Sequence, residues 1–210
     1  YFGSGWDGVN AENVCGYSIG IPETPYDSVE DAIKSSNDNR NKTATELFRV
    51  EDNNFVHVFM QGERRTENKK EKIVTIERYV ISNDIYVTNG KYYYIGARVL
   101  IVGGTELIAE DFKKEDKKYT WSETFLADIF GSKYAYGENF MGKMNNRVFA
   151  WGVSDNPKIE SVTVDGQKID EVHTIDVDGK EYYLWIIYDL QTENKSADVV
   201  IEENKRVHIQ

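Results

Sequence analysis

Histidines and carboxylates are the side chains most often used for acid–base and metal chemistry, and here they form no recognised site pattern. The three histidines, His57, His173 and His208, lack the short spacing of a metal-binding pair. His57 alternates with Phe55 and Phe59, which indicates a histidine packed on a strand. The 36 Asp and Glu residues could supply a glycosidase-like pair anywhere, so their abundance identifies none. The sequence therefore predicts no catalytic residue, metal ligand or cofactor.

Two further patterns imitate functional motifs. Residues 174–179 begin like a calcium-binding loop, but its twelfth position falls on Trp185 where a Glu is needed, so we expect a hairpin. Cys15 is the only cysteine, so it forms no internal disulfide, and the polar residues before it do not match a lipidation signal. We interpret it as an ordinary, partly buried thiol, because no base or electropositive pocket is visible nearby.

Tyrosine is the residue type that suggests binding. The chain has 14 Tyr, 9 Phe and 4 Trp, and an exposed Tyr adds contact area for peptides or sugars at a low entropic cost. The candidate ligand surface consists of Tyr92, Tyr94, Arg98, Tyr134 and Tyr136, which fall on a mixed strand face or in a loop-like segment. The alternative is that the aromatic residues fill the core and sheet faces of a β-rich protein.

The elements that would position these residues begin with a short helix. Asp27 or Ser28 can cap it, and Val29, Ala32 and Ile33 have the spacing of one apolar helical face. Runs rich in Val, Ile, Tyr and Phe then predict antiparallel strands. These strands cover residues 45–50, 55–61, 73–82 and 92–102.

The charged run at residues 62–72 mixes both signs, so we interpret it as a solvated hairpin tip, with a partner-docking loop as the alternative. Alternation within residues 92–102 predicts one apolar and one mixed face. The apolar face consists of Tyr93, Ile95, Ala97, Val99 and Ile101, and the mixed face of Tyr92, Tyr94, Gly96 and Arg98. The pair Gly103-Gly104 is expected to end the strand. Residues 106–118 are expected to be helical in part, 122–130 to form a helix and 133–146 to link the halves.

The second half is punctuated by two Asp-Gly pairs, Asp165-Gly166 and Asp178-Gly179. Asp-Gly is the preferred pair of a two-residue type I′ turn, so consecutive antiparallel strands are expected. They cover residues 148–153, 159–164, 168–177, 181–190 and 197–202. Both alternating sets in residues 182–188 are apolar, which predicts a central strand that is buried on both faces.

These patterns predict a mainly β protein, α+β overall, with two domains. Residues 1–20 are a Gly-rich lead-in, and residues 21–140 form a helix packed on an antiparallel sheet. Residues 147–204 form a small all-β, sandwich-like domain, and the boundary lies within residues 137–147.

The second half also resembles a module of small, mostly uncharacterised lipoproteins and secreted proteins of Gram-positive bacteria. The residues that carry the resemblance are Trp151-Gly152-Val153, Asn156-Pro157-Lys158-Ile159, Val162-Thr163-Val164-Asp165-Gly166 and the strand around Trp185. Residues 26–33 are similar to an upstream segment of the same proteins. The resemblance implies an extracellular or cell-envelope location, and it offers no catalytic residues to carry over to this chain. Because the chain begins at Tyr1 without a Met, we expect that a leader has been removed.

Charge narrows the choice of partner. The net charge of −11 and the absence of a basic stripe in the sequence argue against binding to nucleic acid, and no apolar run is long enough to span a membrane. We interpret the chain as an exported or cell-surface protein that binds a protein or a cell-wall glycan. The alternatives are a cell-wall or glycan hydrolase with an unrecognised carboxylate pair, and an inhibitor or regulator module.

Overall fold

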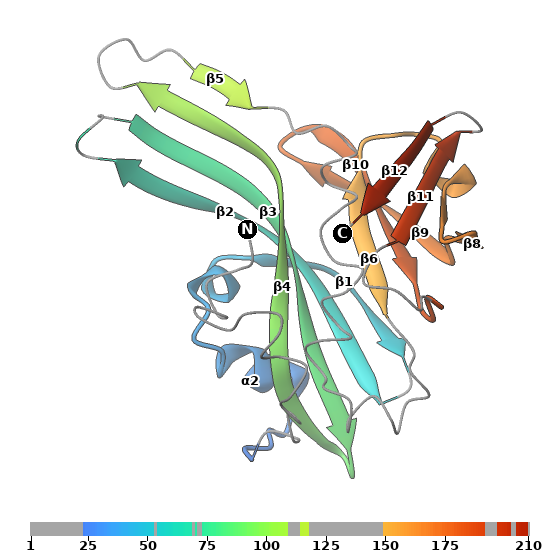
Figure 1. Ribbon diagram of the computed structural model, residues 1–210. Helices are drawn as coiled ribbons and strands as arrows, with labels where there is room; N and C mark the ends of the chain where they lie inside the picture. Colours follow the sequence, from blue (N-terminus) through green and yellow to red (C-terminus); the bar gives the residue numbers. More distant parts are fainter. Residues whose placement is uncertain are drawn as a thin grey trace. The chain divides into compact units, whose positions relative to one another are not determined.

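The chain divides into two compact units, each built around antiparallel strands (Figure 1). The computed structural model describes residues 23–52, 54–68, 70, 73–108, 114–117, 149–191, 197–202 and 205–209. Those before residue 120 belong to the first unit and those after it to the second. The predicted boundary at 137–147, the helix at 122–130, the linker at 133–146 and the lead-in at 1–20 lie outside the described residues.

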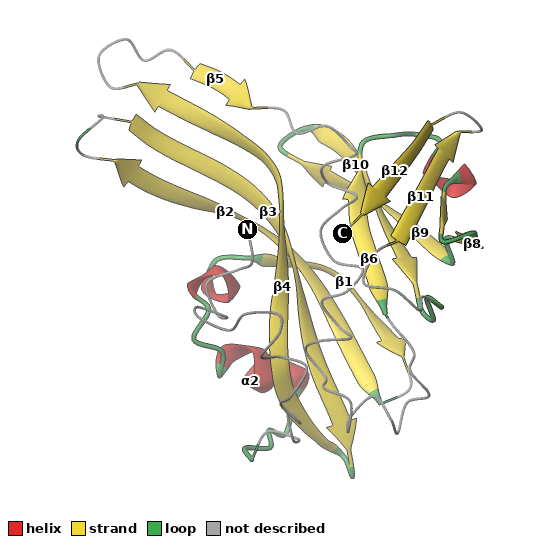
Figure 2. Cartoon of the chain, in the orientation of Figure 1, coloured by secondary structure: helices red, strands yellow, loops and turns green. Residues whose placement is uncertain are grey.

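The first unit is a sheet whose strands follow one another in chain order (Figure 2). All neighbouring strands are antiparallel. The strands are β1 (Thr45–Asp52), β2 (Phe55–Asn68), β3 (Ile73–Thr88), β4 (Lys91–Ile108) and β5 (Lys114–Lys117). The N-terminal helix plus antiparallel sheet predicted for this half is confirmed.

Helix α2 (Val29–Lys34) covers one face of this sheet, and a 3₁₀ turn, η1 (Asn39–Lys42), follows it. Ser28 is the N-cap, and its side chain accepts a hydrogen bond from the backbone of Asp31. The predicted apolar stripe is buried as expected. It packs against Val56, Val58, Met60, Tyr79, Ile81 and Ile85 of β2 and β3. We call this the helix face of the sheet, and the other side the opposite face.

The two faces of strand β4 differ from those that simple alternation predicted. Its register with β3 shifts between Asp84 and Ile85, because Asp84 pairs with Gly96 while Ile85 pairs with Tyr94. Ile95 is therefore the extra residue of a β-bulge, and a bulge reverses the alternation beyond it. As a result Tyr92, Tyr94, Ala97 and Val99 all pack on the helix face. The prediction that Tyr94 and Arg98 share a face was wrong for this reason.

Three further sequence predictions need correction in the first unit. Residues 62–68 of the charged run belong to β2, so they are strand and not the tip of the hairpin. Gly103-Gly104 lies inside β4, which continues to Ile108 with a register shift near Tyr79. The segment expected to be partly helical contains the end of β4 and the whole of β5. Mixed charges and glycines lower β propensity, but long cross-strand pairing outweighs it here.

The second unit contains two small antiparallel sheets, in a sandwich-like all-β arrangement as predicted. One sheet has the order β6-β10-β9 and the other the order β12-β11-β7-β8. The strands of the first sheet are β6 (Ala150–Ser154), β10 (Lys180–Ile187) and β9 (Glu171–Val177). The others are β12 (Lys205–Ile209), β11 (Ala197–Glu202), β7 (Thr163–Val164) and β8 (Gln167–Lys168).

Both Asp-Gly pairs form the predicted tight turns, because all four residues have positive φ angles between 48° and 77°. Asn89-Gly90, between β3 and β4, has the same conformation. The strand expected at 159–164 begins instead as a 3₁₀ turn, η2 (Ile159–Ser161), and the one expected at 168–177 is interrupted before β9. Strand β12 was not predicted.

Strand β10 is the central strand of its sheet and is buried on both faces, as predicted. Trp185 and Ile186 are consecutive, so they point to opposite faces, and both are 0% exposed. Trp185 lies opposite Gly152 of β6, and a Cβ atom built on Gly152 would overlap the indole ring. Gly152 therefore provides the space in which the Trp185 ring packs.

We expect Trp185→Ala to lower the free energy of unfolding by roughly 3–5 kcal/mol, because it removes a large buried ring. Gly152→Ala should cost roughly 1–3 kcal/mol, because its methyl group displaces the same ring. Urea denaturation measures both. Gly96→Ala is the matched control, since a Cβ there meets no described atom. If Gly152→Ala is no less stable than Gly96→Ala, the ring does not depend on this contact.

Candidate functional site

Three consecutive polar residues, Ser82, Asn83 and Asp84, interrupt the apolar centre of strand β3. All three residues are buried, with exposed fractions of 0–1%. Because side chains alternate along a strand, Ser82 and Asp84 lie on the opposite face of the sheet and Asn83 lies on the helix face. One short segment thus serves two separate polar clusters, one on each side of the sheet.

The cluster on the opposite face connects three strands through the carboxylate of Asp84. His57 of β2 lies directly across from Asp84, and its Nδ1 atom is 2.6 Å from Asp84 Oδ1. Arg98 of β4 donates from Nε to Oδ2 at 2.9 Å and from a terminal nitrogen to Oδ1 at 3.0 Å. The two bonds form the bidentate geometry in which a guanidinium binds a carboxylate most strongly.

The charge of Asp84 is set by these neighbours. Burial by itself raises the pKa of the carboxyl, but the positive charge of Arg98 and the hydrogen bond from His57 outweigh it, and the pKa lies well below its usual range. Asp84 is therefore an anion at neutral pH. Since a carboxylate only accepts hydrogen bonds, the Nδ1 atom of His57 carries a proton. The carboxylate thus fixes the tautomer and orientation of the imidazole.

Ser82, His57 and Asp84 are the residue types of a hydrolytic triad, but their arrangement differs from one. The hydroxyl of Ser82 donates to Asp84 Oδ1 at 3.2 Å, the same oxygen that His57 contacts. In a triad the serine instead bonds to the histidine nitrogen that faces away from the aspartate. The side chains of His57 and Asp84 are also only 1% and 2% exposed. This geometry describes a structural anchor and does not activate a nucleophile.

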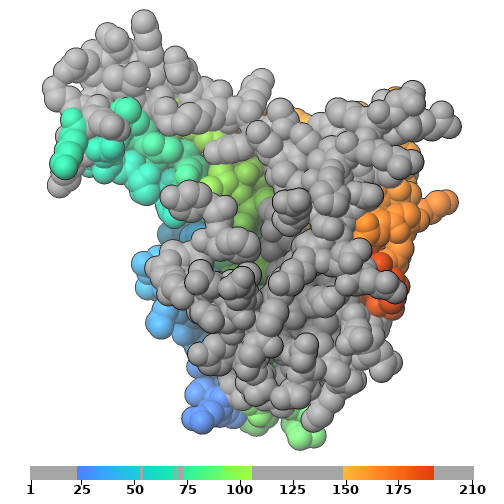
Figure 3. All heavy atoms as spheres, viewed as in Figure 1, coloured from blue at the N-terminus to red at the C-terminus, as the bar shows by residue number. Residues whose placement is uncertain are grey.

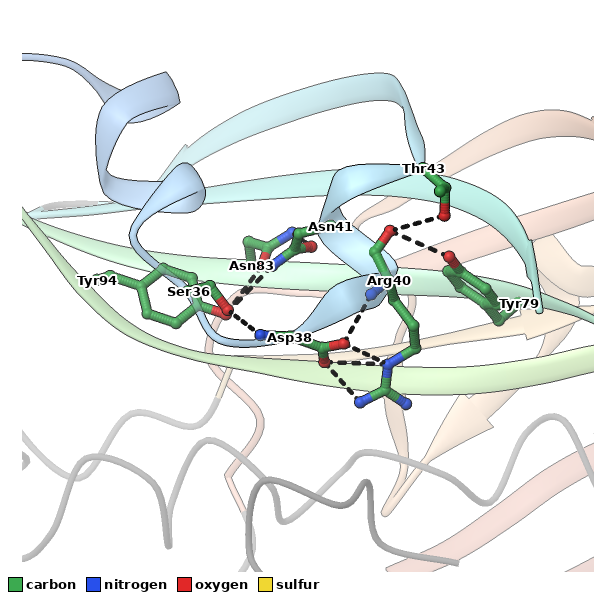
Figure 4. A network of polar contacts seen from close by, with 8 residues as sticks. All are labelled: Ser36, Asp38, Arg40, Asn41, Thr43, Tyr79, Asn83 and Tyr94. Atoms are coloured by element: carbon green, nitrogen blue, oxygen red, sulfur yellow. Dashed lines mark hydrogen bonds and ion pairs between the residues drawn. The ribbon is translucent and has the colours of Figure 1, made fainter. Parts of the chain in front are cut away.

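The cluster on the helix face joins η1 to the sheet (Figure 4). Asn41 and Asn83 exchange two amide hydrogen bonds of 2.8 and 3.0 Å, and the hydroxyl of Tyr94 donates to Asn83 Oδ1 at 3.1 Å. Burial raises the pKa of Tyr94 to about 12, so its hydroxyl stays protonated as a donor. These contacts satisfy polar groups that would otherwise be costly to bury.

Neighbouring contacts hold the rest of this segment. The hydroxyl of Tyr79 donates to the backbone oxygen of Arg40 at 3.1 Å. Asp38 binds the backbone nitrogen of Arg40 and, through both oxygens, its guanidinium (Figure 4). The turn after α2 is therefore fastened to the sheet at several points.

The described residues of the candidate ligand surface do not all come together. Tyr92 and Tyr94 pack on the helix face, whereas Arg98 lies on the opposite face and is bound to Asp84. Tyr134 and Tyr136 lie outside the described residues. Tyr94 and Arg98 are both engaged in internal contacts, so neither has the exposed geometry that was expected for ligand binding.

Sequence reasoning missed Asp84, Ser82 and Asn83. A signal was present, because three polar residues in the middle of an apolar strand must be satisfied if that strand is central. Their partners could not be identified in the same way. His57, Asn41 and Arg98 come from distant parts of the chain, and only the register of the sheet brings them together.

Chemistry that depends on metal ions has no evident site in the described residues, which contain no group of three or more His, Cys, Asp or Glu able to hold an ion. The calcium-like pattern at 174–179 lies in the hairpin of β9 and β10, as expected. None of the helices in the described part of the chain is long and apolar enough to cross a membrane.

Comparison with protein-family models, with curated proteins and with solved structures found no match to this chain.

We expect Asp84→Asn to lower the free energy of unfolding by roughly 3–5 kcal/mol, because it leaves the buried guanidinium of Arg98 without an anion. The change preserves shape, so urea denaturation reports the charge and not a cavity. Asp27→Asn is the control, since Asp27 forms an ion pair with Lys91 while its side chain is 84% exposed. Its denaturation midpoint should stay near that of the wild type. Equal effects of the two variants would contradict the role assigned to Asp84.

The low pKa of Asp84 also predicts how its contribution varies with pH. The unfolded chain takes up the proton near pH 3.9, whereas the folded chain takes it up only at lower pH. The stabilisation is thus complete at neutral pH and declines as the pH falls below about 4. The difference in unfolding free energy between wild type and Asp84→Asn should therefore narrow between pH 7 and pH 3. A difference that stays constant over this range would show that ionisation of Asp84 is not its source.

Proposed function

We propose that this chain is a non-catalytic binding protein that acts outside the cell or at its envelope. The observation that carries the proposal is that reactive side chains are buried and take part in internal contacts. His57 and Asp84, two residues of types used in acid–base chemistry, are buried and bonded to each other, and Arg98 binds the same carboxylate. A general base must reach the proton that it removes from a substrate, and an imidazole that is 1% exposed does not.

The location rests on the resemblance of residues 151–185 to a module of exported Gram-positive proteins. The acidic composition is compatible with it, because a net charge of −11 disfavours nucleic acid and anionic surfaces as partners. The partner class that we propose is a protein or a cell-wall glycan. Antiparallel sheets with short connections suit this role, since they are rigid supports for surface contacts.

The test combines a binding assay with an activity screen. The purified chain should sediment with isolated cell walls, or form a complex with a protein of the cell envelope, in a concentration-dependent manner. It should release no product from peptidoglycan fragments or polysaccharides. His57→Gln is the matched variant, because it keeps a buried polar side chain but cannot act as an imidazole base.

Two outcomes would overturn the proposal. Turnover of a glycan that His57→Gln or the change of one carboxylate abolishes would identify a hydrolase. Absence of binding to both cell walls and envelope proteins would exclude the proposed partner classes. Binding that wild type and His57→Gln share, without turnover, supports the proposal.

A further inference from the structure

Strand β2 extends well beyond its pairing with β1. Pairing with β1 ends at Gln61, whereas pairing with β3 continues to Asn68. No other strand in the described part of the chain pairs with the outer edge of residues 62–68. Residues 63–68 are exposed, and Figure 3 shows this part of the chain in blue-green at the surface. An edge of this kind can add a further strand through its backbone hydrogen-bonding groups.

The side chains of this edge balance in charge, although the chain as a whole is strongly acidic. Glu63, Arg64, Arg65 and Glu67 sum to zero, against a net charge of −11 for the chain. The outer edge of β1 differs, because Glu46, Glu51 and Asp52 outnumber Arg49 and the strand is interrupted by a bulge between Glu46 and Phe48. Two copies of the chain would therefore repel each other less along β2 than along β1.

Among the possible centres at residues 63–67, the order of the charges allows one register between two copies. Consider two copies of β2 that pair antiparallel and are related by a two-fold axis perpendicular to the sheet. Residues that lie opposite each other in such a pair point to the same face of the sheet. The axis must therefore pass beside one residue, which lies opposite the same residue of the other copy. The two-fold axis places like charges opposite each other if it passes beside a charged residue, which is the case at Glu63, Arg64, Arg65 and Glu67. Centring on Thr66 places Arg65 of each copy opposite Glu67 of the other, with no like charges opposed among residues 64–68.

We propose that the outer edge of β2 is a self-association surface, on which a second copy of this chain pairs antiparallel with Thr66 at the two-fold axis. The two sheets then continue into each other, and Arg65 and Glu67 form two symmetric ion pairs on the opposite face. Arg64 stays bound to Glu77 of its own β3 on the helix face.

Charged side chains along an edge normally prevent strands from pairing. Here they act selectively, because an incoming strand without the matching sequence places like charges opposite each other or leaves charges unpaired. The surface therefore accepts a second copy and discourages unrelated strands. This inference does not depend on the proposed binding function.

Sedimentation velocity over a range of concentrations, at low and high salt, tests the surface. Wild type should form a concentration-dependent dimer that salt weakens. Arg65→Glu and Glu67→Arg should each raise the dissociation constant by about tenfold or more, because each places like charges together twice. Mixing the two variants should restore the dimer, since every opposed pair is then complementary. The double variant R65E/E67R should also associate.

The control is Glu51→Arg, which changes net charge as Glu67→Arg does but lies at an exposed position of β1. It should dimerise like the wild type. Circular dichroism checks that each variant is folded, which is expected because the changed side chains are exposed. A wild type that stays monomeric up to millimolar concentration would overturn the proposal. So would a dimer that neither single variant weakens, or single variants that do not complement each other.

Discussion

The carboxylate of Asp84 is the constraint on which the first unit depends. It is a buried anion whose cost is offset by Arg98 on one neighbouring strand and His57 on the other. Such a cluster is satisfied in only one register of β2, β3 and β4, because a slip of one residue would turn a strand's side chains to the other face. Apolar contacts tolerate small shifts, whereas an unpaired buried charge does not. The cluster therefore specifies how three long strands align, in addition to any stability that it contributes.

The same three residues of β3 also position the helix. Asn83 points away from Asp84 and binds Asn41, so the turn after α2 is held against the sheet directly behind the charged cluster. Tyr94 completes the contact only because the bulge at Ile95 returns it to the helix face. The bulge lets one strand supply a hydroxyl to one cluster and a guanidinium to the other. Strict alternation would have placed Tyr94 and Arg98 together and left one cluster incomplete.

The second unit reaches its arrangement by shape instead of charge. Trp185 occupies the space that Gly152 leaves on the neighbouring strand, and the residues around them in β6 and β10 are buried and mostly apolar. Close packing of this kind is sensitive to a single added methyl group but indifferent to pH. The two units thus show different routes to a defined register, one electrostatic and one steric. In the first unit the side chains of His57 and Asp84 are engaged inside the fold, which is why the proposed function is binding.

The sequence by itself determined the features that depend on neighbours in the chain. The Asp-Gly turns, a helix cap at Asp27 or Ser28 and the central position of the strand around Trp185 follow from local φ preferences, capping and apolar patterning. The sequence did not determine that residues 62–68 form a strand, because that depends on pairing with β3. It also did not determine that His57, Asp84 and Arg98 meet. Those three residues come from separate strands, and their meeting depends on a bulge that no local signal marks. Only the tertiary structure decides register, and register decides which polar side chains share a face.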